Sequence, residues 1–123
     1  MTRLSLSGLL LAFGLLVLTF QPVRAENPDQ VKQLRETGKC TGCDLSGADL
    51  AGLTVNLADL RGANLTGAQL YKARLRMANL AGANLSATNL VGADLFGARG
   101  ANLAAAITDD KTTCPDGHAG PCR

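Results

Sequence analysis

Apolar residues recur along most of this chain with a period of five. A leucine or valine occupies every fifth position over eleven consecutive units without a slip. These positions are Leu45, Leu50, Val55, Leu60, Leu65, Leu70, Leu75, Leu80, Leu85, Leu90 and Leu95. The residue two positions before each of them is most often alanine, and glycine is frequent two positions after it. This period is the main structural signal in the sequence.

A five-residue period fits neither a helix nor a flat strand. An α-helix turns by about 100° per residue, so leucines five apart would be scattered around its surface. In a strand, neighbouring side chains point to opposite faces, so an odd spacing would send successive leucines to opposite sides. A chain that turns a corner every five residues, eased by glycine, would point all of them at one axis. Four such units close a square coil, which the period therefore favours.

The repeating unit resembles that of the pentapeptide-repeat proteins. The segments 48–52, 63–67 and 83–87 have the sequences ADLAG, ANLTG and ANLSA, which match an Ala-(Asp or Asn)-Leu-x-x unit. The resemblance covers residues 43–97 and implies an all-β solenoid, namely a right-handed quadrilateral β-helix. Eleven units of this kind correspond to about three coils.

The repeat register changes near its C-terminal end and divides the chain into segments. The sequence Ala101-Asn102-Leu103 resumes the pattern eight residues after Leu95 instead of ten, which predicts a bulged corner over 98–103. We therefore expect a signal peptide over 1–25, an N-terminal capping segment over 26–42, a β-helix over 43–107 and an irregular, cysteine-containing tail over 108–123.

Both ends of a solenoid expose apolar residues that must be covered. At the front, Asn27 is a suitable N-cap, Pro28 a suitable first helical residue and Gln30 stands at the capping-box position. Gly38 provides a stop signal, and Leu34 falls on the apolar side of the segment. The sequence predicts a short helix over the first coil.

The first 25 residues have the features of a secretory signal. Arg3 supplies a positive start, Leu4 to Phe20 is a nearly unbroken apolar run, and Ala25 is suited to cleavage, although the run also allows an uncleaved anchor. Without this segment ten basic residues face ten acidic ones, and a neutral chain does not favour a nucleic-acid partner. We expect export to the periplasm or the medium, or to a thylakoid lumen in a photosynthetic host, with no membrane insertion after cleavage.

Four cysteines flank the repeats in two pairs. Cys40 and Cys43 precede the first coil, and Cys114 and Cys122 follow the last. In an exported chain they imply disulfides, and bridged Cα atoms lie within about 7 Å. Because nearly three coils make a stack about 14 Å tall, we expect the pairs Cys40–Cys43 and Cys114–Cys122. Cys43 occupies an inward position, so a buried free thiol is the alternative for it.

The cysteines also allow two other interpretations. Cys40-Thr41-Gly42-Cys43 has the C-x-x-C spacing of thiol redox proteins, but the βαβ setting that activates such thiols is absent from the pattern. Cys114, His118 and Cys122 are of the types that bind zinc. The height of the stack opposes a site shared with the first pair, and we expect no metal and no cofactor.

The repeats offer little for catalysis. General acid, base or nucleophilic chemistry needs a positioned base beside a nucleophile in a concave site, which a leucine-filled coil does not supply. The Asp and Asn residues that precede the inward leucines have a structural explanation, because they can accept hydrogen bonds from a turn or from the next coil. We therefore expect no enzymatic activity.

The outer surface is then the candidate for function. After the signal segment the only aromatic residues are Tyr71 and Phe96. Stacking at twenty-residue intervals brings them next to the clustered bases of the repeats. The predicted interaction surface consists of Tyr71, Lys72, Arg74, Arg76, Met77 and Phe96.

These observations favour an exported, non-catalytic module that has a structural role or binds a protein partner. A thiol redox protein using Cys40 and Cys43 is the alternative. Some pentapeptide-repeat proteins imitate DNA and inhibit topoisomerases, but over 43–97 four acidic residues balance four basic ones. A DNA mimic needs a strongly anionic surface, so this third hypothesis is the weakest.

Overall fold

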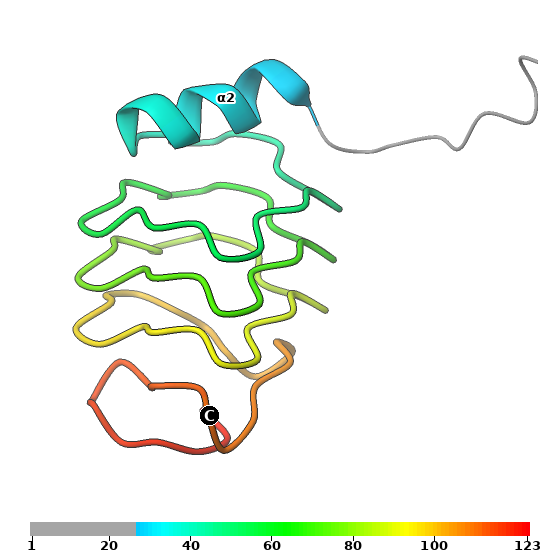
Figure 1. The fold of residues 1–123 in the computed structure, drawn as a ribbon. Helices are drawn as coiled ribbons and strands as arrows, with labels where there is room; N and C mark the ends of the chain where they lie inside the picture. The colour runs from blue at the N-terminus through cyan, green and yellow to red at the C-terminus, as the bar shows by residue number, and fades with distance from the viewer. Residues whose placement is uncertain (1–26) are drawn as a thin grey trace, which may run out of the picture.

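The chain forms a stack of four-sided coils, as the computed structural model shows for residues 27–123 (Figure 1). Parallel bridges join residues twenty positions apart, such as Asp44 with Asn64 and Asn64 with Asn84. One bridge occurs every five residues, so each coil has four sides. The bridges are isolated pairs because the chain turns again before a longer strand can form. The predicted signal peptide over 1–25 lies outside the described residues.

The leucine ladder forms the core of the stack. All eleven ladder positions from Leu45 to Leu95 are buried. The small residues two positions before them are also buried, except for the partly exposed Ala83. Where Thr88 takes the place of alanine, its hydroxyl donates a hydrogen bond of 2.7 Å to the carbonyl of Leu65. The core is therefore aliphatic, and the hydroxyl of Thr88 is satisfied inside the coil.

Each corner is a tight turn with one left-handed residue. The N–H of Ala48 donates to the carbonyl of Leu45 at 3.1 Å, and the same bond recurs in most repeats. The third residue of the turn has positive φ, for example 68° at Gly47, as a type II turn requires. Glycine adopts this conformation without steric cost, which explains its frequency two positions after the ladder residue.

The Asp or Asn residue before most ladder positions supports the turn. Asn64 accepts a hydrogen bond from the backbone N–H of Thr66 at 3.1 Å, and Asn84 accepts the equivalent bond from Ser86 at 3.0 Å. A contact to the equivalent side chain of the next coil also occurs, from Asn89 to Gln69 at 3.1 Å. The recurring Asp and Asn residues thus have the structural role expected for them.

The coil is shortened between Arg99 and Ala105, so the expectation of a bulge over 98–103 is wrong. Asn79 still pairs with Arg99, twenty residues on, whereas Asn89 pairs with Ile107, only eighteen residues on. The chain therefore omits two residues from this coil instead of adding any. A Cβ on Gly100 would lie 2.7 Å from the Cα of Ala81, so the close approach of the two coils requires glycine there.

Helix α2 (Pro28–Thr37) covers one end of the stack (Figure 1). Asn27 caps it by accepting from the N–H groups of Asp29 and Gln30, and the left-handed Gly38 ends it. Leu34 is fully buried against the core. None of the helical structure described over 27–123 has the length and hydropathy of a membrane-spanning segment.

Gln30 has a different partner from the one that its capping-box position predicts. Its side-chain oxygen accepts a hydrogen bond from the backbone N–H of Asp44, in the first coil. The guanidinium of Arg35 likewise donates to the carbonyl of Asp49 at 2.9 Å. The helix is thus fastened to the coil by side chains from both of its ends.

The C-terminal tail begins as a continuation of the coil. Thr113 forms a parallel bridge with Asp94, so the ladder extends past residue 107. The chain then turns back, and Thr113 pairs in antiparallel fashion with Ala119. The buried hydroxyl of Thr112 donates to the carbonyl of Leu90 at 2.9 Å. The tail therefore closes the end of the stack opposite α2.

A disulfide lies at each end of the stack. Cys40 is bonded to Cys43, with Cα atoms 5.2 Å apart, and Cys114 to Cys122, with Cα atoms 5.5 Å apart. These are the expected partners, and residues 27–123 contain no free cysteine. Both bonds are buried or nearly so.

The coil register makes a direct prediction about stability. Leu70→Ala removes a buried ladder side chain and should lower the free energy of unfolding by about 2–5 kcal/mol through lost burial and a cavity. Ser86→Ala, on the outer surface, should change it by less than about 0.5 kcal/mol. Chemical denaturation of both variants measures the difference, and equal losses would contradict the assigned register.

Candidate interaction face

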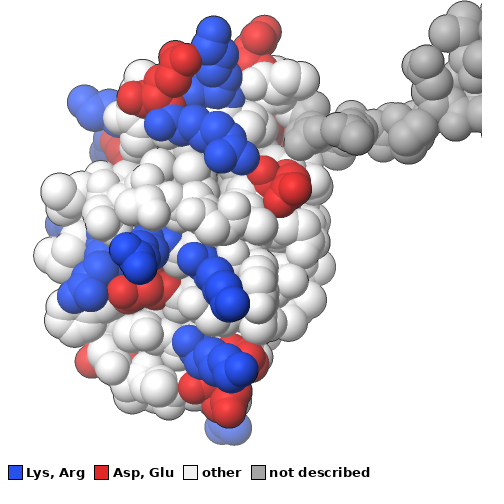
Figure 2. All heavy atoms as spheres, viewed as in Figure 1, with Lys and Arg blue, Asp and Glu red and all other residues white. Residues whose placement is uncertain are grey.

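The residues of the predicted interaction surface lie together on one side of the coil. The backbones of Thr54, Arg74 and Asp94 pair in parallel along the middle of this side. The turns at its two edges contribute Leu57, Tyr71, Lys72, Arg76, Met77 and Phe96. We call this surface the Arg74 face. In the view of Figure 2, Lys and Arg side chains gather over the middle coils with acidic side chains beside them.

Most of the strained backbone in the described chain is at the corners of the Arg74 face. Four non-glycine residues of 27–123 have positive φ, and three of them, Leu57 at 63°, Lys72 at 56° and Met77 at 60°, lie at these corners. The fourth, Ala87, lies at another corner. This conformation costs a non-glycine residue about 1–2 kcal/mol. The sequence keeps long side chains where glycine would fit with less strain.

Lys72 lies flat along its corner of the face. The residues twenty positions before and after it are both glycine. A Cβ on Gly92 would lie 3.2 Å from the Cγ of Lys72, so the lysine side chain occupies the space above this glycine. The Lys72 ammonium is 5.0 Å from the centroid of the Tyr71 ring. A cation at this distance is attracted to the ring face, and the two side chains form one edge of the surface.

At the other corner, an arginine joins an aromatic ring to a carboxylate. The Arg76 guanidinium is 5.0 Å from the centroid of the Phe96 ring, and its Nη1 is 3.3 Å from Oδ2 of Asp94. The other Asp94 oxygen accepts from the backbone N–H of Phe96 at 3.1 Å. Leu57 and Met77 are 75 % and 48 % exposed beside them. This edge therefore offers apolar and aromatic contact area in a fixed arrangement.

A surface hollow lies between the Tyr71 edge and the C-terminal tail. It is lined by Tyr71, Lys72, Ala73, Arg74, Val91, Gly92, Asp94, Asp109 and Lys111. Asp109 accepts from the N–H of Gly92 at 3.3 Å and from that of Lys111 at 3.0 Å. Desolvation opposes ionisation of Asp109, but these backbone hydrogen bonds hold its pKa below the ordinary value. The charged Asp109 thus fastens the tail to the edge of the hollow.

Asp109 and Lys111 line the hollow but were not among the residues expected in the interaction surface. They belong to the tail, which lacks the repeat that fixes the position of every residue in the coil. The shortened corner further displaces the tail from the register of the repeats. The sequence contains no periodic signal that could have placed them.

The cations of the hollow have no acidic partner within residues 27–123. No ion pair joins Lys72, Arg74 or Lys111 to a carboxylate there. By contrast, Arg61 on another side of the coil lies 2.7 Å from Asp59, and its hydrogen bond lowers the pKa of Asp59 to about 2. The basic side chains of the hollow therefore make no ion pair within the described chain, although the carboxylates of Asp94 and Asp109 line the same hollow.

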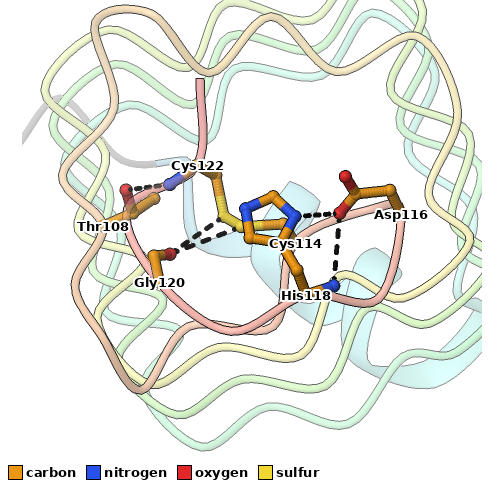
Figure 3. Close-up of polar contacts among 6 residues, drawn as sticks. All are labelled: Thr108, Cys114, Asp116, His118, Gly120 and Cys122. Carbon is orange, nitrogen blue, oxygen red and sulfur yellow. Dashed lines mark hydrogen bonds and ion pairs between the residues drawn. A yellow bond between two sulfur atoms is a disulfide. The ribbon is translucent and has the colours of Figure 1, made fainter.

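The cysteine and histidine at the C-terminal end do not supply a zinc ligand set. Ligand atoms of Cys114, Asp116 and His118 lie within 4.8 Å of one another, but the Cys114 sulfur is bonded to Cys122. Zinc binds cysteine as the thiolate, which a disulfide sulfur cannot provide. Figure 3 shows the His118 ring turned toward Asp116, with which it pairs on the exposed surface. The bonded cysteines therefore do not support the zinc hypothesis.

Comparison with solved structures finds related coils. The chain is similar to a pentapeptide repeat protein of Nostoc PCC 7120, with 26 % identity, a TM-score of 0.54, and coverage of 84 % of this chain and 90 % of that one. HetL of Nostoc sp. strain PCC 7120, described as involved in heterocyst differentiation regulation, is 31 % identical over 70 % of this chain, with a TM-score of 0.49. The chain spans only 46 % of the length of HetL.

A thylakoid-lumen pentapeptide repeat protein of Arabidopsis thaliana is 25 % identical, with coverage of 72 % of this chain and 68 % of that one and a TM-score of 0.29. No curated protein matches the chain.

A protein-family model matches the repeats of this chain. The model described as pentapeptide repeats (8 copies) matches residues 39–76, 64–99 and 75–106. Together these ranges cover more than half of the chain and coincide with the buried ladder. The chain is therefore a member of the pentapeptide-repeat family.

Proposed function

We propose that this protein is an exported, non-catalytic module that binds a protein partner through the Arg74 face. The observation that carries the proposal is the strain at Leu57, Lys72 and Met77. Backbone strain persists at functional sites because the surrounding structure supports it and the function requires it. Glycine at these corners would give an equally regular coil. The long side chains must therefore have a role other than forming the turn.

The composition of the face supports a protein partner. Aromatic residues, methionine and arginine are enriched at protein interfaces, and this face combines Tyr71, Phe96, Met77 and two arginines. Its backbone is held by hydrogen bonds between coils, such as those from Arg74 N–H to Leu53 O at 2.7 Å and from Met77 N–H to Phe96 O at 2.8 Å. A rigid surface loses little entropy on binding, which favours affinity.

Catalysis has little support on this face. Its carboxylate, Asp94, is already engaged by Arg76 and by the N–H of Phe96. The single histidine of the sequence, His118, belongs to the C-terminal end of the stack. General acid and base catalysis needs such groups beside a nucleophile at one site. The geometry is suited to binding.

The alternative functions have weaker support. A redox disulfide must be reached by an attacking thiolate, yet Cys40 is fully buried and Cys43 is 5 % exposed. A DNA mimic needs an anionic surface, but the Arg74 face has three basic residues and one acidic residue. Neither hypothesis accounts for the strained corners.

Export follows from a separate argument. Disulfides form and persist in oxidising compartments, and all four cysteines are paired in the structure. Together with the signal-like sequence over 1–25, this supports secretion to the periplasm or the medium, with a thylakoid lumen as the equivalent address in a photosynthetic host.

The export proposal predicts the mass of the protein isolated from its native host. We expect a chain that begins at Glu26 and that reacts with an alkylating reagent only after reduction. Intact mass spectrometry of samples alkylated before and after reduction measures both properties. A full-length chain with reactive thiols would contradict export.

Site-specific photocrosslinking in the native host tests the interaction face. A photoreactive residue at the exposed Thr54 should give a discrete protein adduct that Arg74→Ala with Arg76→Ala removes without lowering the melting temperature. The matched control is Asn64, which has the equivalent position two sides away around the coil. Equal adducts from both positions, or none from Thr54, would refute the proposal.

A further inference from the structure

We propose that the hollow beside Tyr71 binds a side-chain carboxylate from an acidic peptide segment of the partner. This inference rests on the proposed function and names the chemistry that the Arg74 face recognises. The binding groups are Lys72 and Arg74 from the coil and Lys111 from the tail, all of which line the hollow. The repeat pattern alone assigns no ligand-binding role to these residues.

The charge distribution of the hollow favours an anion. Three cations line it, and none is ion-paired within residues 27–123. Of its two carboxylates, Asp94 is paired with Arg76, and Asp109 accepts from the N–H groups of Gly92 and Lys111. Both acids keep their negative charge, so the three cations leave the hollow with one positive charge in excess. An incoming carboxylate would gain charge-assisted hydrogen bonds from them.

The position of Lys72 is fixed by the coil. Its left-handed backbone, with φ of 56°, and the space over Gly92 direct its side chain along the surface, where the ammonium lies 5.0 Å from the Tyr71 ring centroid. A lysine side chain that is already held against a ring loses less rotamer entropy when it binds a ligand. This pre-organisation offsets the free-energy cost of the left-handed backbone at Lys72. The opposite wall is also fixed, because Asp109 fastens the tail to Gly92.

The size and charge of the site favour an acidic peptide over a nucleic acid. A continuous phosphate backbone would pass close to the charges of Asp94 and Asp109, which line the same hollow. Single-stranded nucleic acid also needs several aromatic platforms, whereas Tyr71 is the only aromatic residue that lines the hollow. A side-chain carboxylate brings one negative charge to the hollow, so it meets less repulsion from the two acids than a run of phosphates would.

Titration by nuclear magnetic resonance tests the proposal on the disulfide-bonded protein labelled with nitrogen-15. The probe is an acetylated and amidated tetraglutamate peptide, and its control is the tetraglutamine peptide, which has the same length without charge. We expect saturable shifts at the amides of Tyr71, Gly92 and Lys111 with the glutamate peptide only. Lys72→Gln with Lys111→Gln should weaken binding by at least about tenfold, whereas Arg61→Gln should not.

The following outcomes would each contradict the proposed carboxylate site. Shifts spread equally over the surroundings of Arg61 would show unspecific ionic contact, and equal shifts with tetraglutamine would show that charge is not recognised. Saturation by inorganic phosphate at the same concentration would indicate a general anion site. If the Thr54 adduct persists in Lys72→Gln with Lys111→Gln, the Arg74 face still binds its partner and only the carboxylate site is rejected.

Discussion

The hydrogen bond that closes a turn every five residues determines the rest of this structure. It joins the N–H of a small residue to the carbonyl of the ladder residue three positions earlier, as between Ala48 and Leu45. The turn requires a left-handed third residue and brings the chain back on itself after twenty residues. Leucine in the interior, alanine beside it, asparagine before it and glycine after it are all consequences of this geometry.

Because the interior residues are so uniform, the residues that depart from the repeat lie at the corners and on the outer faces. Most corners contain glycine, which adopts the left-handed conformation freely. Leu57, Lys72 and Met77 depart from this rule on a single face and carry side chains that contact an aromatic residue or solvent. Three of the four left-handed non-glycine residues of 27–123 lie at this face, which distinguishes it from the other three.

The sequence predicts the repeating part well because each residue of the coil has an assigned position. The five-residue period predicts the buried ladder, and Asn27, Pro28 and Gly38 predict helix α2. The contact of Gln30 with Asp44 was not predictable, since it depends on how the helix lies on the coil. The same limit applies to the shortened corner near Gly100 and to Lys111, whose positions follow from tertiary packing after the period ends.

We propose that strain at the Arg74 face is retained for binding, and the Lys72→Gly variant provides a direct test. Relief of the left-handed strain, less the entropy that glycine adds to the unfolded chain, should raise the free energy of unfolding by about 0.5–1 kcal/mol. Ala87→Gly relieves the same strain at another corner and should give a similar gain. We expect Lys72→Gly also to lower the yield of the partner adduct from Thr54 and Ala87→Gly to leave that yield unchanged. Lower stability, or an unchanged adduct in Lys72→Gly, would contradict it.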